Sequence, residues 1–292
     1  YFSADFRYHP VSLLISKLLK LHNKEEFEIY AFSFSLLKED FYTEKIKESV
    51  DKYFDIKDLS NDQILKFVRS HDIDIAIDLM GHTENARTSI FSSRVAPIQI
   101  NYLGFSGSMG AKFMDYIIAD KVLIKDNEKH FYDEKILYLN QSAICVDDDL
   151  KRNFLKRSFK KERQNRFIFV CFNNNYKISP DEFDVWGKLL RNIDKSYLWL
   201  KASNDIAENN LIKEANKRGI DSNRLIFANH ADFDDHIERH YEGDLFLDTF
   251  NYNAHTTAVD ALWTGLPIIT KPGNSFSSRV CGSLLKFFDL DE

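Results

Sequence analysis

The sequence predicts an α/β protein of two domains, each built around a parallel sheet, that face each other across a cleft. Short apolar runs alternate with stretches of helical periodicity along all 292 residues. Strands separated by helices form right-handed βαβ units, which give parallel sheets. A change in composition at residues 141–165 divides the alternation in two. At 44% hydrophobic residues, the chain can also bury a substantial core.

The N-terminal domain is expected to span residues 1–140. It opens on "YFSADF", which is typical of the end of a strand, and an apolar helix is expected after His9 and Pro10. Further strands are expected in "FEIYAFSF", "IDIAIDLMG", "PIQINYLG", "FMDYIIAD" and "EKILYL". Helical patterns lie between these strands, in "KIKESVDKYF", "QILKFVRSHD" and "NARTSIFSSR".

The C-terminal domain is expected at residues 166–292, after a charged linker at residues 141–165. The linker holds the basic run "KRNFLKRSFKKER", and a run of this kind is usually solvated. Strands are expected in "RFIFVCF", "SYLWLKA", "RLIFAN", "DLFLDTF" and "PIITK". Helices are expected in "PDEFDVWGKLLRNI", in "NDIAENNLIKEANKRG" and from Thr256 to Trp263.

The composition excludes several classes of protein. The net charge is −6, and basic residues outside the linker are dispersed, which argues against nucleic-acid binding. No apolar run is long enough to span a membrane, and no signal peptide is evident. Three widely spaced cysteines argue against a disulfide framework and for a cytoplasmic protein. The chain lacks an initiator Met and ends within the helical "SLLKFFDLDE", so we expect a fragment of a longer protein.

Polar side chains gather where the strand "DLFLDTF" gives way to a helix. His255, Thr256 and Thr257 stand at the first helical positions. Ligands of doubly wound sheets bind beyond the carboxyl ends of strands, and the unpaired amides of a helix N-terminus favour an anion. We therefore expect a phosphate group here. Helix capping by Asn253 or Thr256 alone is an equally open alternative.

Other strand-to-helix loops have the same character. Lys177 lies in the polar turn "NNNYKISP" between a strand and a helix, where it could meet a phosphate or a leaving group. His9 precedes the first helix, and the loop "GHT" follows the strand "IDIAIDLM". A glycine-rich turn spans Gly104–Gly110, and "ANHADFDDHIERH" supplies a further loop. All of these loops are expected to face the cleft.

Two sequence patterns resemble metal-binding motifs but do not match them fully. His236 and His240 are four residues apart, but their order is H-I-E-R-H rather than H-E-x-x-H, and a third ligand is not evident. The acidic run "DIDIAID" overlaps an alternating strand, which favours a buried strand with acidic ends. We therefore expect no metal site. The glycine-rich turn lacks the GxGxxG spacing of dinucleotide-binding proteins.

With these loops in order, the sequence resembles the catalytic region of the O-linked N-acetylglucosamine transferase family, which are GT-B glycosyltransferases acting on proteins. The resemblance covers essentially the whole chain. It rests on seven motifs in the order "SADFRYHPVS", "DIDIAIDLMGHT", "RVAPIQINYLGFSG", "MDYIIAD", "FNNNYKISP", "YNAHTTAVDALWTGLPIIT" and "SRV". It implies the GT-B fold, with two Rossmann-like domains, and inverting transfer of N-acetylglucosamine from UDP-GlcNAc to Ser or Thr hydroxyls without a cofactor or metal.

The resemblance also implies the site. The implied donor-binding residues are Asn174, Lys177, Ala231, His236, Arg239, His255, Thr256, Thr257 and Asp260. Of these, Lys177 and the His-Thr-Thr triplet would bind the diphosphate, and Asp260 would reach the ribose. Ala231 and Arg239 would read the uracil, against which His236 would pack. The implied catalytic residues are Lys177 together with His9 and Asp72, which would line the sugar and acceptor side.

Some features depart from the family pattern or leave alternatives open. Phe233 stands where a lysine usually contacts the ribose, and Ser106 replaces a proline near the donor sugar. Transfer of glucose to Asn or of fucose to Ser or Thr would use the same fold, and a nucleotide-binding module without turnover is a further alternative. The general base could be His9, an Asp72-linked water chain or the substrate phosphate. Helical repeats are expected in the full-length protein, outside this chain.

Overall fold

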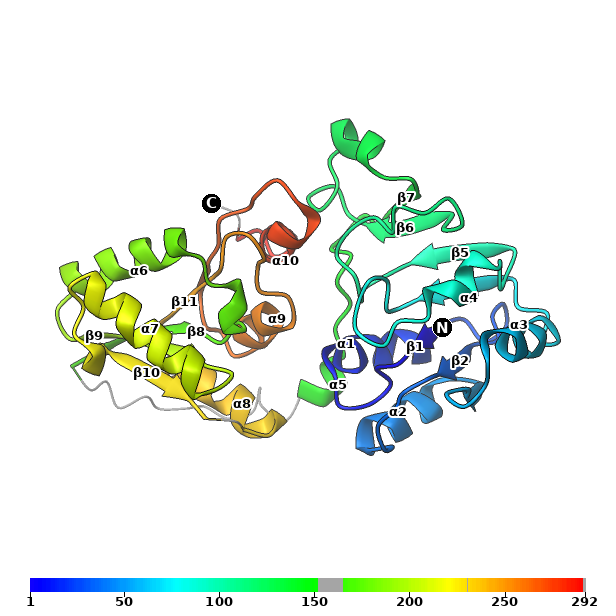
Figure 1. The fold of residues 1–292 in the computed structure, drawn as a ribbon, viewed down its shortest axis with the longest axis horizontal. Coiled ribbons are helices and arrows are strands. Elements are labelled where there is room, and N and C mark those ends of the chain that lie inside the picture. The colour runs from blue at the N-terminus through cyan, green and yellow to red at the C-terminus, as the bar shows by residue number, and fades with distance from the viewer. Residues whose placement is uncertain (152–164, 230, 291–292) are drawn as a thin grey trace. The chain divides into compact units, whose positions relative to one another are not determined.

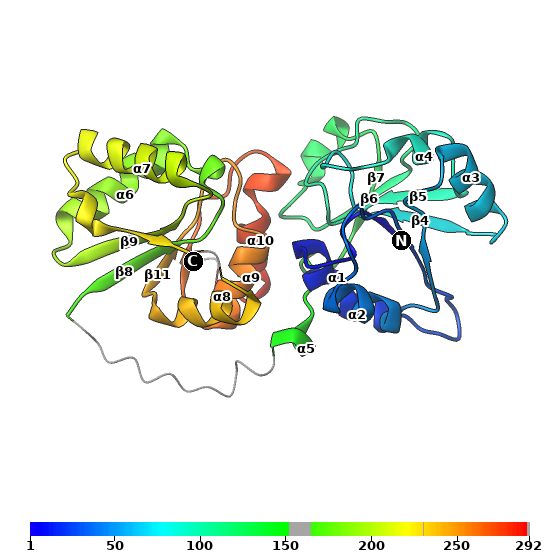
Figure 2. The ribbon, with the colours of Figure 1, turned by 60° about the horizontal axis from the view of Figure 1, so that its bottom comes forward.

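The computed structural model describes residues 1–151, 165–229 and 231–290. The chain divides into two compact units, Tyr1–Leu150 and Lys151–Glu292. Each unit is a parallel sheet with helices on both faces, as Figures 1 and 2 show. The two α/β domains predicted from the alternation of strands and helices are confirmed. No helix in the described part of the chain is long and apolar enough to cross a membrane.

The first unit holds seven strands in the order β3-β2-β1-β4-β5-β6-β7. They are β1 (Phe2–Ser3), β2 (Tyr30–Ser33), β3 (Lys52–Asp55), β4 (Ile75–Asp78), β5 (Ile98–Asn101), β6 (Tyr116–Ala119) and β7 (Lys135–Tyr138). The helices are α1 (Pro10–Lys20), α2 (Phe41–Ser49), α3 (Asn61–Arg69), α4 (Thr88–Ser92), the 3-10 helix η1 (Asp126–Phe131) and α5 (Asp148–Lys151). The strand order reverses between β1 and β4, and such a switch point is where ligands of doubly wound sheets bind.

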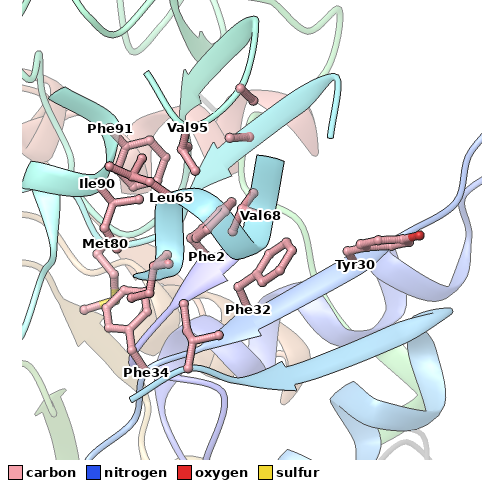
Figure 3. Packing of buried hydrophobic residues seen from close by; sticks show 14 of the residues in the cluster. Phe2, Tyr30, Phe32, Phe34, Leu65, Val68, Met80, Ile90, Phe91 and Val95 are labelled. Atoms are coloured by element: carbon pink, nitrogen blue, oxygen red, sulfur yellow. The ribbon is translucent and has the colours of Figure 1, made fainter. Parts of the chain in front are cut away.

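Apolar side chains hold helices to both faces of this sheet. On one face, Phe2 and Phe32 stack at a centroid distance of 4.7 Å and pack with Val68 of α3 and Phe91 of α4, as Figure 3 shows. On the other face, a second cluster packs α1 and α2 against the sheet through Phe6, Val11, Ile15, Leu19 and Ile46. These buried contacts fix the strand ends, and the loops that follow them, in place.

The second unit holds five strands in the order β10-β9-β8-β11-β12. They are β8 (Phe167–Cys171), β9 (Ser196–Lys201), β10 (Leu225–Ala228), β11 (Leu245–Leu247) and β12 (Ile268–Ile269). The helices are α6 (Pro180–Asn192), α7 (Asp205–Lys217), α8 (Phe233–Arg239), α9 (Thr256–Trp263) and α10 (Val280–Phe287), with short 3-10 turns that include η2 (Asn175–Lys177). Helices α6 and α7 pack on one face of the sheet, and the switch point lies between β8 and β11.

One predicted helix was wrong over its last residues. The pattern "KIKESVDKYF" was expected to be helical throughout, but α2 ends at Ser49 and Lys52–Asp55 forms β3. Val50 is extended, and the Phe54 ring stacks on Phe32 of β2 at 5.5 Å. Pairing and aromatic packing against β2 therefore override the local helical pattern.

The predicted linker divides between the two parts of the chain. Its first residues belong to the first unit, since Tyr102 donates its hydroxyl to Ala143 O at 2.9 Å and Lys17 of α1 forms ion pairs with Asp148 and Asp149. Residues 152–164, which include most of the basic run, lie outside the described residues.

Candidate functional site

Two loops meet at the carboxyl edge of the second sheet. The loop after β8 supplies Asn173 and the loop after β11 supplies Asp248, and both side chains are buried. Asn173 Nδ2 donates to Asp248 Oδ1 at 3.1 Å, and the Thr257 hydroxyl of α9 donates to Asn173 Oδ1 at 2.6 Å. Because β8 and β11 flank the switch point, these contacts lie where a ligand of such a sheet binds.

Lys177 supplies the positive charge of this edge. Its Nζ donates to Asn253 O at 3.1 Å and lies 3.9 Å from the ring centroid of Tyr252. Burial lowers the pKa of Lys177 to about 8, although the nearby Asp248 carboxylate opposes that shift. A lysine with this pKa is still mostly protonated near neutral pH, so the fold holds a cation beside the N-terminus of α9.

Helix α9 begins at the same edge with donors that the fold leaves available. Its N-cap is His255, whose side chain makes no capping hydrogen bond. The first backbone bonds run from Ala258 and Val259 to His255 O, at 3.1 and 3.2 Å. Within the described residues, the amides of Thr256 and Thr257 make no hydrogen bond. Unpaired amides at a helix N-terminus are suited to an anion.

The side chains of the His-Thr-Thr triplet differ in what they can offer. The His255 ring stacks on Tyr252 at 4.7 Å, and its Nε2 lies 3.3 Å from Ser277 O. Burial, together with the charge of Lys177, lowers the pKa of His255 to about 3, so the ring is neutral. The Thr257 hydroxyl already donates its hydrogen bond to Asn173 Oδ1, whereas the Thr256 hydroxyl makes no hydrogen bond within the described residues. Thr257 therefore meets an anion through its amide, and Thr256 can use both groups.

Helices α8 and α9 approach each other beside this anion site. His236 Nε2 lies 3.5 Å from Asp260 Oδ2, which joins the two helices. Arg239 Nη1 donates to Asn229 O at 3.2 Å, and its guanidinium lies 5.4 Å from the Phe172 ring. Aromatic, cationic and carboxylate groups are thus gathered beyond the carboxyl ends of β8, β10 and β11.

The remaining donor-binding predictions fall at the same edge. Ala231 is half-buried, directly before the N-cap Asp232 of α8. Asn174 is partly exposed at the start of η2, and its amide lies 3.4 Å from the Tyr176 hydroxyl. All predicted donor-binding residues therefore come from loops or helices that follow β8, β10 and β11. His240, in contrast, is fully buried, and its Nδ1 lies 2.8 Å from His236 O.

His9 lies at the switch point of the first sheet. Its Nδ1 accepts a hydrogen bond from Val11 N at 3.3 Å, which caps α1, and lies 3.4 Å from Asp5 Oδ2. Burial and the charge of Arg7 lower the pKa of His9 to about 4, so the ring is neutral at neutral pH. A neutral imidazole that accepts through Nδ1 carries its proton on Nε2. In this arrangement His9 presents a hydrogen-bond donor.

The structure does not bring Asp72 to His9. Asp72 follows α3 and precedes β4, so it lies at the amino edge of the sheet, whereas His9 follows β1 at the carboxyl edge. Its side chain is exposed, and its φ of 50° places it in a left-handed turn. The expectation that Asp72 and His9 share one side of a site is therefore corrected. Asp78 ends β4 at the carboxyl edge instead, where it accepts from Met80 N at 2.9 Å and Gly81 N at 3.1 Å.

Sequence reasoning missed several buried polar residues at the two switch points. They are Asp5 and Asp78 in the first unit and Asn173 and Asp248 in the second. Burial raises the pKa of Asp78 to about 6, and it raises the pKa of Asp248 as well. Their shared signal is a short polar side chain at or just beyond the last buried position of a strand. Among the described residues, no group of three or more His, Cys, Asp or Glu side chains could hold a metal ion.

Known proteins are similar to this chain in sequence and in fold. Residues 1–167 and 155–292 match the family described as glycosyl transferase family 41. A probable UDP-N-acetylglucosamine–peptide N-acetylglucosaminyltransferase of Arabidopsis thaliana, SEC, is 33% identical over 291 residues, which cover 97% of this chain and 30% of that protein. A Caenorhabditis elegans protein named as such a transferase is 26% identical over 98% of this chain and 35% of its own length. The chain therefore spans 30–35% of the length of these relatives.

Solved structures agree with the sequence matches. A mutant O-GlcNAc transferase of Thermobaculum terrenum superposes with a TM-score of 0.92 at 27% identity, over 100% of this chain and 55% of that one. Anabaena Alr3699/HepE, solved with UDP, superposes with a TM-score of 0.56 at 13% identity, over 99% of this chain and 89% of that one, and shows likeness of fold alone. The resemblance carried by the seven motifs and the predicted GT-B type of fold are confirmed.

Proposed function

Because the chain belongs to glycosyl transferase family 41, we propose that the protein is an inverting glycosyltransferase that moves N-acetylglucosamine from UDP-GlcNAc to Ser or Thr hydroxyls of other proteins. The observation that supports this most is the anion site of the second unit. It combines the buried ammonium of Lys177 with the unbonded amides of Thr256 and Thr257 at one switch point. These groups suit the diphosphate of a nucleotide sugar.

The proposed chemistry is attack of the acceptor hydroxyl on the anomeric carbon with departure of UDP. The bond from that carbon to the diphosphate oxygen breaks, and negative charge grows on the diphosphate. Lys177 and the amides of α9 are fixed in place before the reaction, so they stabilise that charge without reorganising. His255 is neutral and contributes no charge of its own.

The nucleoside is proposed to occupy the edge beside the anion site. Asp260 would accept from the ribose, and its contact with His236 keeps both side chains in place. Arg239 and the backbone of Ala231 would meet the uracil, and Asn174 would lie beside the phosphates. His236 and Arg239 lie on α8, and Asp260 lies on α9. The packing of these helices therefore fixes the backbone from which the three side chains project.

The proposed role of His9 is donation through Nε2 to the sugar or the acceptor. Its Nδ1 is already occupied as the cap of α1, and its pKa is low. A general base would need a free nitrogen lone pair facing the acceptor, which this tautomer does not supply. The acceptor proton would then pass to the substrate phosphate, which the sequence left open as an alternative to His9 and to an Asp72-linked water chain.

The names of the relatives favour N-acetylglucosamine over glucose or fucose as the transferred sugar. Metal-independent turnover is part of the proposal, since a lysine and a helix N-terminus supply the positive charge that a metal would supply elsewhere. Cytoplasmic location is also part of it, and the three unpaired cysteines support a reducing compartment. Cell fractionation checks the location.

Replacing Lys177 tests the proposed function. Lys177→Ala in the full-length protein should lower both transfer and slow donor hydrolysis by a factor of roughly 100 to 1,000, because removal of one preorganised donor costs about 2.7 to 4 kcal/mol. Lys188→Ala, at an exposed position of α6, is the matched control and should keep wild-type rates. Rates are measured with UDP-GlcNAc, UDP-glucose and GDP-fucose, each with and without EDTA. Wild-type turnover in Lys177→Ala would reject the assignment of this site.

A further inference from the structure

Asp248 is a buried carboxylate of the anion site that accepts four hydrogen bonds. Only 2% of its surface is exposed. Its Oδ1 accepts from Asn173 Nδ2 at 3.1 Å, from Thr249 N at 2.8 Å and from Ala254 N at 2.6 Å. Its Oδ2 accepts from the Thr270 hydroxyl at 2.6 Å. One carboxylate therefore ties together the loops that follow β8, β11 and β12.

We propose that Asp248 is a positioning residue of the transferase, which presents Lys177 and the N-terminus of α9 to the departing diphosphate. The inference rests on the proposed function and adds to it a residue that acts through others. Two routes connect Asp248 to the groups that would touch the ligand, and each follows hydrogen bonds within the second unit.

The first route runs through Asn173 to α9. The Asn173 amide nitrogen donates two hydrogen bonds, one to the Asp248 carboxylate and one to the Thr249 hydroxyl at 2.9 Å. These bonds fix which end of the Asn173 amide faces α9. Asn173 Oδ1 is thereby left to accept from the Thr257 hydroxyl. The first turn of α9 is anchored to β8 in an orientation that frees the Thr257 amide.

The second route runs through the turn at residues 249–254. The bonds from Thr249 N and Ala254 N close this turn onto Asp248 at both ends. The turn contains Tyr252 and Asn253, which are the contacts of the Lys177 ammonium. Loss of the carboxylate would loosen the turn and with it the position of Lys177.

Charge adds to this geometry. The groups that act on Lys177 are Asp248 on the loop after β11, Cys171 on β8 and Lys201 on β9, and Lys177 in turn acts on His255. Burial lowers the pKa of Lys177, and Asp248 is the first of the groups that raise it. Thr270 donates to the same carboxylate, and the Cys281 thiol also interacts with it. Removing the negative charge should therefore lower the pKa of Lys177 further.

The experiment compares Asp248→Asn with Asp244→Asn in the full-length protein. Asp244 joins the same two strands at their amino edge, where its Oδ2 accepts from Ile168 N at 2.8 Å, so it controls for a lost carboxylate in the same sheet. UDP affinity is measured by calorimetry, and kcat for UDP-GlcNAc hydrolysis is measured across pH. Asp248→Asn should lower kcat at least tenfold and move the alkaline limb of the profile to lower pH, because neutral Lys177 forms earlier. Asp244→Asn should leave that limb in place.

A second pair of variants covers the case in which Asp248→Asn does not fold. Thr270→Val removes one hydrogen bond from the carboxylate and keeps the charge, whereas Thr270→Ser keeps both. Since that bond lowers the pKa of Asp248, Thr270→Val should move the acid limb of the profile to higher pH relative to Thr270→Ser. Identical acid limbs in this pair, or an alkaline limb in Asp248→Asn equal to that of Asp244→Asn, would overturn the inference. A wild-type protein that neither binds UDP nor hydrolyses UDP-GlcNAc would instead overturn the proposed function.

Discussion

The side chain of Phe233 is 9% exposed at the first position of α8, directly after the N-cap Asp232. It stands where the family pattern led us to expect a lysine that contacts the ribose. A phenyl ring that is this deeply buried contributes to packing and offers no polar group to a ribose. We therefore expect Phe233→Lys to weaken the fold without tightening UDP binding.

The expected loss of stability has a clear physical cause. Replacing a buried aromatic ring removes about 3 kcal/mol of packing, and a lysine placed there must also carry its charge to solvent. Thermal unfolding should show a lowered midpoint, and calorimetry should show UDP affinity at or below that of the wild type. Phe233→Leu is the control, with a smaller loss. A stable Phe233→Lys that binds UDP more tightly would show that this side chain turns outward to the ribose.

At the scale of single residues, the sequence predicted which polar side chains gather at the sheet edge better than it predicted which hydrogen bonds each of them makes there. Lys177 and the His-Thr-Thr triplet were predicted together because their types and positions after strands suit a phosphate, and the structure places them at one edge of the second sheet. The commitment of the Thr257 hydroxyl to Asn173 was not predictable, because the two residues are 84 positions apart and meet only when β8 and β11 pair. Asp248 was overlooked as well, because an aspartate after a strand is also an ordinary turn residue.

Helix α1 and its cap show how one side chain can serve an element and a site together. His9 caps α1 through Nδ1, and Pro10 occupies the first helical position. Asparagine is a good cap without an imidazole, so His9→Asn separates the two roles. His9→Ala should lose about 1 kcal/mol of stability, and His9→Asn should lose little.

Activity should respond differently from stability. Both His9 variants should transfer sugar to peptide more slowly than the wild type, because both lack the Nε2 donor. UDP affinity should be unchanged, since the proposed donor-binding residues all belong to the second unit. Chemical unfolding, calorimetry with UDP and a peptide-transfer assay measure the three quantities. Full transfer by His9→Asn would show that His9 is only a cap.

At the level of elements, the alternation of strands and helices was predictable where periodicity was strong. The helix expected from Thr256 to Trp263 has those bounds in the structure. The strand β3 was missed because the helical pattern of α2 continues through its residues, and pairing with β2 decides its conformation instead. Asp72 was misplaced for a related reason, since the sequence did not show that it lies before β4 at the amino edge of the sheet.

Across the whole molecule, buried ionisable groups set opposing responses to acid. Burial lowers the pKa of His240 and of His255 in the second unit to about 3. Burial raises the pKa of Asp78 in the first unit to about 6. The unfolded histidines take up protons near pH 6.5, so their contribution to stability is complete above that pH and is lost as pH falls toward the folded values. Asp78 acts in the opposite direction, because the folded state binds its proton first as pH falls through about 6.

His240 gives the clearest test of this acid response. It is fully buried, and its Nε2 has no hydrogen-bond partner in the described part of the chain. Its ring packs edge-on against Phe172 at 5.0 Å and against His236 at 4.9 Å. Protonation would leave a buried charge without an acceptor, so acid should favour unfolding of the second unit. His240→Phe keeps the ring and removes the proton site.

The measurement is the unfolding midpoint of the wild type and of His240→Phe between about pH 7.5 and about pH 5. The wild type should lose several degrees over this range, and His240→Phe should lose clearly less, even if its midpoint at neutral pH is lowered by the missing bond to His236 O. His130→Phe, at an exposed position, should follow the wild type. Asp78→Asn should steepen the acid loss of the first unit, where burial lowers the pKa of His9 to about 4, because the proton that folded Asp78 takes up near pH 6 no longer offsets it. An acid loss in His240→Phe equal to that of the wild type would show that this ring does not govern the response of the second unit.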